Sequence, residues 1–342
     1  MRATRITNSL LIAMAVVVIF IYGKNLIIPF VIALFFWFLI KEIRDLVNKV
    51  PFIKNKIPNM VLNLFGTLLI FAILGGVVQI LAVNIKQLSS SLPEYQKNMQ
   101  DIAAYFNTTF NIDLVARAKE FLGDYEYTSF LKGLFNSLTD LFGKAFLIII
   151  YTLFLLLEEP FFSSKIHAIY SKQENFEEVD VILKQIDKSI GRYISIKTLV
   201  SLSTGILSYI ALLFIGIDAP LFWAFLIFLM NYIPTIGSLI ATIFPAVFAM
   251  LQFGEVMPGV WTLIIVGAIQ LIMGNYIDPK LTGDSLNVSP LVVILGLAFW
   301  GATWGIIGMI LSVPISVMII TIFSKIPATR SIAIILSKRG NV

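Results

Sequence analysis

Polar side chains that could do chemistry are rare in the C-terminal third of the chain, and they cluster there. Residues 198–323 contain five charged side chains, and three of them, Asp278, Lys280 and Asp284, fall within seven positions. Charge is costly at bilayer depth, so a polar cluster between apolar runs is either an exit loop or a site for a polar solute. Asp278 and Lys280 could neutralise each other at the membrane surface, or they could titrate in a proton- or sodium-coupled step.

A second polar element is the segment Asn-Tyr-Ile-Pro-Thr-Ile-Gly-Ser at residues 231–238. Pro234 removes one backbone amide and Gly237 adds backbone freedom, so peptide groups lose their helical partners inside an apolar run. In lipid those groups need a partner from protein, water, an ion or a solute. Asn231 and Tyr232 add side-chain donors and acceptors. We interpret the segment as a broken helix that lines a transport path, with a simple tight turn between two spans as the alternative.

The tripeptide Asn-Tyr-Ile occurs again 44 positions later, at residues 275–277. A proline follows each copy within two residues, so the two elements are either an internal repeat or a coincidence of three residues. Together they define the predicted solute path, which consists of Asn231, Tyr232, Pro234, Gly237, Asn275, Asp278, Pro279, Lys280, Gly283 and Asp284.

Transport of a cation would need different chemistry, namely an acid whose pKa is raised by burial so that it titrates in the membrane. The candidates for this proton- or ion-coupling role are Asp278, Asp284, Asp218 and Glu158.

A series of glycines after the second element predicts close helix packing. Gly301 and Gly305 form a small-xxx-small pair, which lets two helices approach closely in lipid. The predicted packing residues are Gly296, Gly301, Gly305, Gly308 and Pro314. Packing alone explains the series, and a closely packed gate helix that moves is the sharper alternative.

The composition places the chain in a membrane and excludes several kinds of site. Of 342 residues, 58% are hydrophobic and 13% are charged, whereas a soluble domain carries about 25% charged residues. The chain has no cysteine, one histidine and no glycine-rich phosphate loop, so we expect no thiolate chemistry, no metal site and no ATP hydrolysis. The sequence has no set of residues typical of an enzyme active site, so we predict a protein without cofactor or catalytic residues. The net charge of +5 predicts contact with anionic membrane lipids rather than with nucleic acid.

Apolar runs of membrane length divide the chain into six parts, because a transmembrane helix needs about 20 apolar residues. These parts are an N-terminal hairpin and third span (1–84), an extracytoplasmic helical insert (85–140), a span ended by Pro160 (141–160), a cytoplasmic amphipathic helical region (161–197), a C-terminal transport core (198–323) and a cytoplasmic tail (324–342). The expected fold is an all-α polytopic membrane protein with about eight transmembrane helices, including broken or re-entrant helices in the C-terminal half.

Two connecting regions have specific expectations. Residues 41–59 carry five basic residues and two prolines, and they predict a loop. The insert has three amphipathic stretches, at 92–106, 112–122 and 130–142, so it lies against the membrane or a neighbouring subunit, or it is a solvated linker.

The distribution of basic residues predicts the orientation. One side of the predicted topology, which includes both termini, carries 18 of the 25 Lys and Arg residues. The positive-inside rule makes that side cytoplasmic, so the insert faces outward and the number of crossings is even.

The C-terminal half resembles the AI-2E family of bacterial transporters. The resemblance rests on residues 192–245, with their NYIPTIG motif, and it continues through GNYIDPKLTGDSLNVSP and the glycine series to about residue 323. The family positions matched here are Asn231, Pro234, Gly237, Asn275, Pro279 and Gly283, with Asp278 and Lys280 matching less closely. The resemblance implies the bacterial inner membrane, seven or eight spans, no ATPase domain and homo-oligomers, with the pentamer as one such assembly. It also implies either of two activities, export of small organic signals or sodium(lithium)/proton antiport.

Three functions therefore remain open from the sequence. The leading hypothesis is export of a small polar organic molecule such as autoinducer-2. The second is cation/proton antiport through one of the four candidate acids. The third is a non-transporting oligomeric membrane scaffold whose amphipathic helices are the working surfaces.

Overall fold

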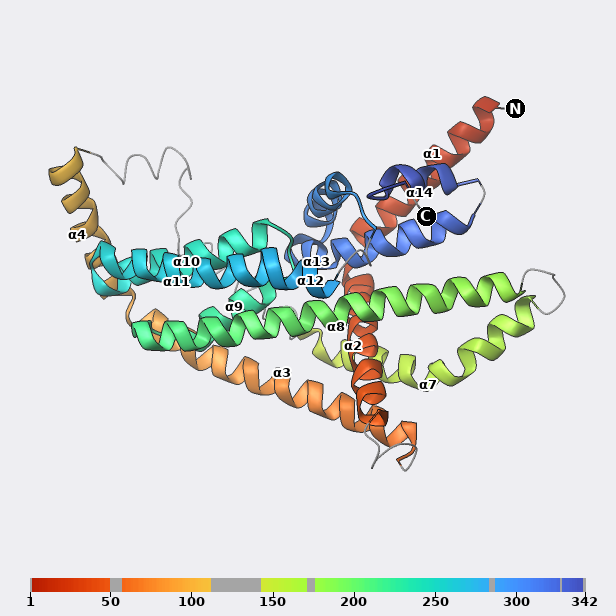
Figure 1. Ribbon diagram of the computed structural model, residues 1–342, viewed down its shortest axis with the longest axis horizontal. Coiled ribbons are helices and arrows are strands. Elements are labelled where there is room, and N and C mark those ends of the chain that lie inside the picture. Colours follow the sequence, from red (N-terminus) through yellow and green to blue (C-terminus); the bar gives the residue numbers. More distant parts are fainter. Residues whose placement is uncertain are drawn as a thin grey trace. The chain divides into compact units, whose positions relative to one another are not determined.

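The protein is α-helical throughout the part of the chain that the structure describes. The computed structural model describes residues 2–49, 57–111, 143–170, 176–282, 287–326 and 328–340, and it confirms the predicted all-α fold (Figure 1). Within these ranges the only β-type pairing is one isolated antiparallel bridge between Val288 and Ser337. The helices are α1 (Arg2–Tyr22), α2 (Lys24–Asn48), α3 (Asn59–Ser90), α4 (Leu92–Phe110), α7 (Ala145–Tyr170), α8 (Phe176–Ile215), α9 (Pro220–Met230), α10 (Ile236–Phe253), α11 (Val256–Ile272), a π-helix (Met273–Ile277), α12 (Asp278–Thr282), α13 (Pro290–Lys325) and α14 (Arg330–Leu336).

Seven segments among the described residues are long and apolar enough to cross a bilayer. They lie in α2, α3, α7, α8, α10, α11 with its extension, and the second half of α13. The helix α9 and the first half of α13, Pro290–Trp304, are apolar but shorter. The chain is therefore a polytopic membrane protein, as its composition predicts, and its short apolar helices lie in the C-terminal half.

Two predicted helix ends are wrong, because the helices continue beyond the apolar segments. The helix α2 runs to Asn48, into the predicted loop, since its basic residues are held by acidic partners as described below. The helix α7 passes through Pro160 and ends at Tyr170, because an internal proline removes only one helical hydrogen bond when the rest of the helix is well formed. The helix α8 joins the predicted cytoplasmic region and the transport core in one helix of 40 residues.

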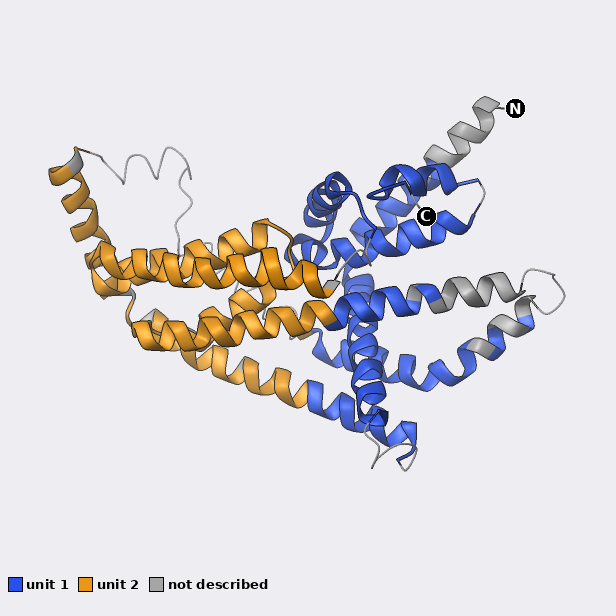
Figure 2. Cartoon of the chain, viewed as in Figure 1, with its two compact units in different colours: residues 1–70, 144–195, 282–342 blue, residues 71–143, 196–281 orange. Residues whose placement is uncertain are grey.

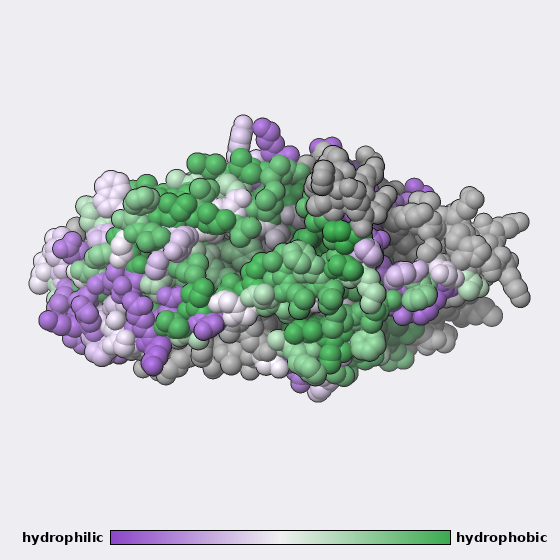
Figure 3. Space-filling view, turned by 90° about the horizontal axis from the view of Figure 1, so that it is seen from below, coloured by the Kyte–Doolittle hydropathy of each residue, from purple (hydrophilic) through white to green (hydrophobic). Residues whose placement is uncertain are grey.

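The predicted extracytoplasmic insert is described only at its beginning, in α4. This helix buries Tyr95 and Ile102 and exposes polar residues such as Glu94 and Lys97. In Figure 3 apolar side chains cover broad areas of the coloured surface, whereas many hydrophilic side chains gather on the part of unit 2 that carries α4. The other two amphipathic stretches, at residues 112–122 and 130–142, lie outside the described residues.

The chain forms two compact units that are interleaved in the sequence (Figure 2). Unit 1 consists of residues 1–70, 144–195 and 282–342, and unit 2 consists of residues 71–143 and 196–281. Residues from α3 and α8 belong to both units.

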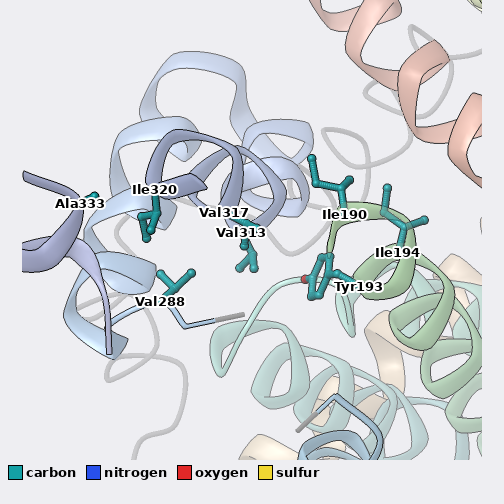
Figure 4. Close-up of a cluster of buried hydrophobic side chains, with 8 residues drawn as sticks. All are labelled: Ile190, Tyr193, Ile194, Val288, Val313, Val317, Ile320 and Ala333. Atoms are coloured by element: carbon teal, nitrogen blue, oxygen red, sulfur yellow. The ribbon is translucent and has the colours of Figure 1, made fainter. Parts of the chain in front are cut away.

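The core of unit 1 gathers side chains from distant parts of the sequence. One cluster joins α8, α13, α14 and the bridge residue Val288; it consists of Ile190, Tyr193, Ile194, Val288, Val313, Val317, Ile320 and Ala333 (Figure 4). A second cluster packs Trp300 and Trp304 of α13 against Ile28 of α2, and the Trp304 Nε1–H donates a hydrogen bond to the Phe20 carbonyl at 2.9 Å.

Candidate functional site

The central element of unit 2 is a helical hairpin formed by α9 and α10. At its tip the Cα of Gly237 lies against the carbonyl of Met230, and near its open end the rings of Trp223 and Phe248 are 4.9 Å apart. The two helices are therefore antiparallel, and residues 231–235 form the turn between them. This geometry is common to both interpretations of the segment drawn from the sequence, the broken helix and the tight turn between two spans.

The turn contains a strained γ-turn. Thr235 has φ 61° and ψ −59°, and the Ile236 N–H donates to the Pro234 carbonyl at 2.6 Å. This combination of positive φ and a hydrogen bond across two residues is rare for a non-glycine residue and costs about 1–3 kcal/mol. Pro234 favours it, because proline cannot donate the amide hydrogen bond that would continue α9.

Gly237 allows the two helices to meet directly after the turn. A Cβ at this position would lie 1.8 Å from the Met230 carbonyl oxygen and 3.0 Å from the Ile233 Cβ. Backbone atoms cannot move away as a flexible side chain can, so glycine is needed here for close approach rather than for positive φ.

The polar side chains of the turn are buried against α8. Asn231 is 6% exposed, and its Nδ2 donates to the Ser201 Oγ at 3.2 Å and lies 3.5 Å from the Thr204 Oγ1. Tyr232 is 4% exposed, and its hydroxyl donates to the Thr198 Oγ1 at 2.7 Å. The turn is therefore fixed to α8 by side-chain hydrogen bonds within the apolar part of the chain.

The face of α8 that receives the turn is polar over three helical turns. Thr198, Ser201, Thr204 and Ser208 recur at spacings of three and four, so they share one side of the helix. Ser201, Thr204 and Ser208 are completely buried, and the Ser208 Oγ has no hydrogen-bond partner. A buried row of hydroxyls inside a membrane unit offers donors and acceptors without any charge.

The second Asn-Tyr-Ile element does not interrupt its helix. Residues Met273–Ile277 form a π-helix between α11 and α12, and the Asp278 N–H donates to the Met273 carbonyl. The helix thus continues through Pro279, and the expectation of a second interrupted helix is wrong. The wider turns of the π-helix change the hydrogen-bond pattern before the proline, so the helix does not have to end there. Asn275 is exposed and Tyr276 is 67% exposed.

The charged residues of the second element contact α8 and a neighbouring ring. Asp278 forms an ion pair with Lys197, with the Lys197 Nζ 2.6 Å from the Asp278 Oδ2; the Lys197 side chain is 10% exposed and the Asp278 side chain is 19% exposed. The ammonium group of Lys280 lies 5.9 Å from the centre of the Tyr276 ring. Gly283 and Asp284 lie outside the described residues.

Both elements therefore attach to the same stretch of α8. Lys197, the partner of Asp278, directly precedes Thr198, the partner of Tyr232. Lys197 is not among the residues predicted from the sequence, although a lysine at the start of an apolar run, next to a hydroxyl face, could have indicated it.

The other two candidate acids lie elsewhere. Asp218 accepts a hydrogen bond from the Tyr95 hydroxyl at 2.7 Å, and its backbone amide donates to the Gln252 side chain at 2.7 Å. Burial, together with this hydrogen bond to Asp218, raises the pKa of Tyr95 to about 12. Glu158 is half exposed and pairs with Lys165. The described partners of these two residues, Tyr95, Gln252 and Lys165, lie outside the turn at residues 231–235.

Glu159 is more buried than the neighbouring Glu158. Glu159 in α7 accepts hydrogen bonds from Arg44 of α2 at 2.7 and 3.1 Å, and the Trp37 indole donates to it at 3.3 Å. Arg44 also donates to Asn63 of α3 at 3.1 Å. This cluster ties three helices of unit 1 together, and the sequence analysis missed it because the three helices are far apart in the chain.

The glycine series forms a second hairpin, in unit 1. Gly305 has φ 66° and ψ −144° and interrupts α13. The two halves of α13 then fold back on each other, since Gly296 faces Ser316, Gly301 faces Met309, and a Cβ on Gly308 would lie 1.9 Å from the Trp300 carbonyl oxygen. Gly305 makes the turn, while the other three glycines lie where the halves approach; Pro314 is buried in the second half.

Comparison with known proteins identifies the family. A sequence profile described as AI-2E family transporter matches residues 9–328. The chain belongs to the AI-2E transporter family. It is 32% identical to a "Putative transport protein" of Borreliella burgdorferi over 73% of this chain and 68% of that protein. It is 27% identical to the AI-2 transport protein TqsA of Escherichia coli K12 over 92% of this chain and 90% of that protein. A third relative, from Haemophilus influenzae, is 28% identical over 95% of both chains.

This AI-2E transporter presents hydrogen-bonding groups rather than reactive ones at the hairpin. In the described residues, no three His, Cys, Asp or Glu side chains are placed to hold a metal ion. Asn231 and Tyr232 of the turn supply an amide and a phenol, and the facing side of α8 supplies the four hydroxyls of Thr198, Ser201, Thr204 and Ser208. The neighbouring ion pair of Lys197 with Asp278 is neutral as a pair. Such groups can bind an uncharged polar molecule without burying an unpaired charge.

Proposed function

We propose that this protein exports a small, uncharged, polar organic molecule across the bacterial inner membrane, and that the α9–α10 turn is the place where the molecule is held. The observation that carries the proposal is the strained turn at Thr235 with Asn231 and Tyr232 buried against hydroxyls of α8. Strained backbone and buried hydrogen-bonding side chains within a membrane unit are expensive, and binding sites are where such features are usually retained.

The chemistry of the site favours an uncharged cargo. An ion at the turn would need a counter-charge, and the nearest charged groups in the described contacts, Lys197 and Asp278, are already paired with each other at 2.6 Å. Hydroxyl and carbonyl groups on a cargo could replace the hydrogen bonds between Asn231, Ser201 and Thr204 at little cost. A hydroxylated signal of the autoinducer-2 kind fits this description, and the name of the Escherichia coli relative supports the same cargo.

Flux measurements on the purified protein test the proposal. Vesicles containing the protein are loaded with a labelled hydroxylated diketone signal, and efflux is compared between the native chain, Asn231→Ala and Asn275→Ala. We expect efflux from the native protein, strong loss in Asn231→Ala and little change in Asn275→Ala. Absence of efflux above protein-free vesicles, with the folded protein present, would exclude export of this class.

A second candidate function is sodium(lithium)/proton antiport, which one observation favours. The pair of Asp278 and Lys197 joins an acid and a base between two membrane segments, and a cation could replace the lysine on the carboxylate. Under a sodium gradient, antiport would move protons in a way that Asp278→Asn abolishes. A pH-sensitive dye inside the vesicles measures this flux in the same preparation.

We also propose that both termini are cytoplasmic, that α4 faces outward and that the protein assembles as a homo-oligomer in contact with lipid. The native chain lacks cysteine, so single cysteines can be introduced at Glu94 and at Ser324 without removing any other. A membrane-impermeant maleimide applied to intact spheroplasts should label the first position and not the second. Crosslinking in native membranes followed by mass measurement gives the number of subunits.

A further inference from the structure

One buried polar side chain near the hairpin has no partner. Gln270 in α11 is 5% exposed, and neither its Nε2 nor its Oε1 forms a hydrogen bond. A buried carboxamide without partners costs about 1–3 kcal/mol. An apolar residue of the same size would avoid that cost, so the position calls for an explanation.

Gln270 lies on the side of α11 that packs against α10. A Cβ on Gly259 would lie 2.7 Å from the Ala246 carbonyl oxygen of α10, and Gly267 faces Thr242 at 3.5 Å. Gln270 is eleven residues after Gly259, which at 3.6 residues per turn is an offset of only about 20° around the helix. The buried residues Thr262 and Val266 occupy the same face.

The position of Gln270 along α11 places it level with the hairpin turn. The contacts of Gly259 with Ala246 and of Gly267 with Thr242 show that α10 and α11 are antiparallel. One helical turn beyond Gly267, Gln270 is therefore level with the first turn of α10, which begins at Ile236 directly after the γ-turn. That end of α10 has no side-chain cap; its first two N–H groups donate to the carbonyls of Pro234 and Ile233, and the helix dipole still gives this end partial positive charge.

The π-helix begins three residues after Gln270. Residues Met273–Ile277 form wider turns, a feature found disproportionately at functional sites. Gln270 is thus placed between the start of α10 and a local irregularity in its own helix, with one donor group and one acceptor group that are free to bind.

From this geometry we infer that Gln270 binds the cargo at the hairpin turn, and that the cargo carries a carbonyl next to a hydroxyl. The Nε2–H donates to the cargo carbonyl, the Oε1 accepts from the neighbouring hydroxyl, and the start of α10 favours the electron-rich oxygens. This inference rests on the proposed function and specifies the cargo class and a binding residue outside the predicted solute path.

The experiment uses dihydroxyacetone, an uncharged ketone with a hydroxyl on each side, as the probe. Its effect on the thermal unfolding midpoint and its counterflow into vesicles are measured for the native protein, Gln270→Met and Thr262→Val. Gln270→Met keeps the length of the side chain and removes both polar atoms. Thr262→Val is the matched control, since Thr262 is also buried on this face but donates to the Pro258 carbonyl at 2.8 Å.

We expect Gln270→Met to weaken the response to dihydroxyacetone about ten- to hundredfold, while its unfolding midpoint without probe is unchanged or higher. Thr262→Val should respond as the native protein does. An undiminished response in Gln270→Met overturns the role of Gln270 and leaves the proposed function intact. Flux of other uncharged solutes without any response to dihydroxyacetone overturns the cargo class, and absence of flux for every uncharged solute overturns the proposed function as well.

A second variant tests the chemistry even if Gln270→Met is poorly folded. Gln270→Glu keeps the shape, and its protonated carboxyl has one donor and one acceptor, whereas its ionised form has acceptors alone. We therefore expect the response of Gln270→Glu to dihydroxyacetone to recover as the pH falls, with no such change in the native protein. A response that is independent of pH in this variant would contradict binding by Gln270.

Discussion

The two Asn-Tyr-Ile elements of unit 2 have the same residues and opposite environments. At residues 231–233 the asparagine and tyrosine are buried and hydrogen bonded to α8. At residues 275–277 they are exposed on a π-helix, and the following Asp278 pairs with Lys197 of α8. A short motif therefore does not carry a function by itself; the position of the next proline and the neighbouring helix decide what the side chains do.

The difference begins one residue after the motif. Pro234 follows the first isoleucine directly, and the chain turns back through the γ-turn at Thr235. In the second element Asp278 separates the isoleucine from Pro279, and the helix continues. The first element thus becomes the tip of a hairpin, while the second remains on the side of a helix.

The largest difference between the two elements is expected for their neighbouring glycines. Gly237→Ala places a Cβ 1.8 Å from the Met230 carbonyl oxygen, so we expect a loss of more than about 4 kcal/mol in stability and the loss of flux. Gly274→Ala is the control, because a Cβ there meets no atom within 4 Å. Thermal unfolding in detergent compares them, and equal stability of the two variants would contradict the tight hairpin.

The ion pair of the second element should have the next largest effect. Lys197→Met removes the ammonium partner of the largely buried Asp278 carboxylate, so we expect a loss of about 3–5 kcal/mol in stability. The double variant Lys197→Met/Asp278→Leu should recover most of that loss, and Lys280→Met, at an exposed position, should change little. A double-mutant cycle from unfolding midpoints gives the coupling, and independent, additive effects would contradict the pairing.

The two asparagines should differ by a smaller amount. Asn231→Ala removes the hydrogen bond from Asn231 to Ser201, and the buried Ser201 hydroxyl loses this donor. We therefore expect about 1–3 kcal/mol of destabilisation together with reduced flux. Asn275→Ala should remain within about 0.5 kcal/mol of the native protein, since Asn275 is exposed. Similar losses for both would mean that the second element is also part of a buried site.

The smallest effect is a pH dependence at the open end of the hairpin. The pKa of Tyr95 is raised from 10.0 to about 12, so the folded protein holds this proton more tightly than the unfolded chain. Its contribution to stability is complete below pH about 10 and is lost as the pH rises towards about 12.

The difference in tyrosinate absorbance between the native protein and Tyr95→Phe should therefore titrate near pH 12. Tyr105→Phe serves as the control, since Tyr105 in the same helix is 52% exposed. A difference that titrates near pH 10 for Tyr95 would contradict both the burial of its hydroxyl and its hydrogen bond to Asp218.

Sequence reasoning succeeded where a requirement of the bilayer acts on single segments. The apolar run at residues 236–253 coincides with α10, because a membrane helix must satisfy its backbone internally over about 20 apolar residues. The break at Pro234 was predictable for the same reason, since proline cannot donate the bond that continues α9.

Sequence reasoning failed where the outcome depends on pairing across the chain. Lys197 and Asp278 are 81 positions apart, and nothing in either local sequence identifies the other as its partner. Gly305 fitted a packing motif, yet it forms the turn of the second hairpin, because its backbone adopts a positive φ. Gln270 lies in an apolar run, and its lack of partners is a property of the packed helices.

The sequence by itself determined that this chain lies in a membrane, where its apolar helices occur and that the helix breaks before Pro234, since each of these follows from transfer of one segment from water to lipid. The tertiary structure alone decided which polar groups are buried, paired or left without partners. Hydrogen bonds and ion pairs are interactions between two groups at short range, so only the packing of α8, α10 and α11 could assign partners to Asn231 and Asp278 and leave Gln270 without one.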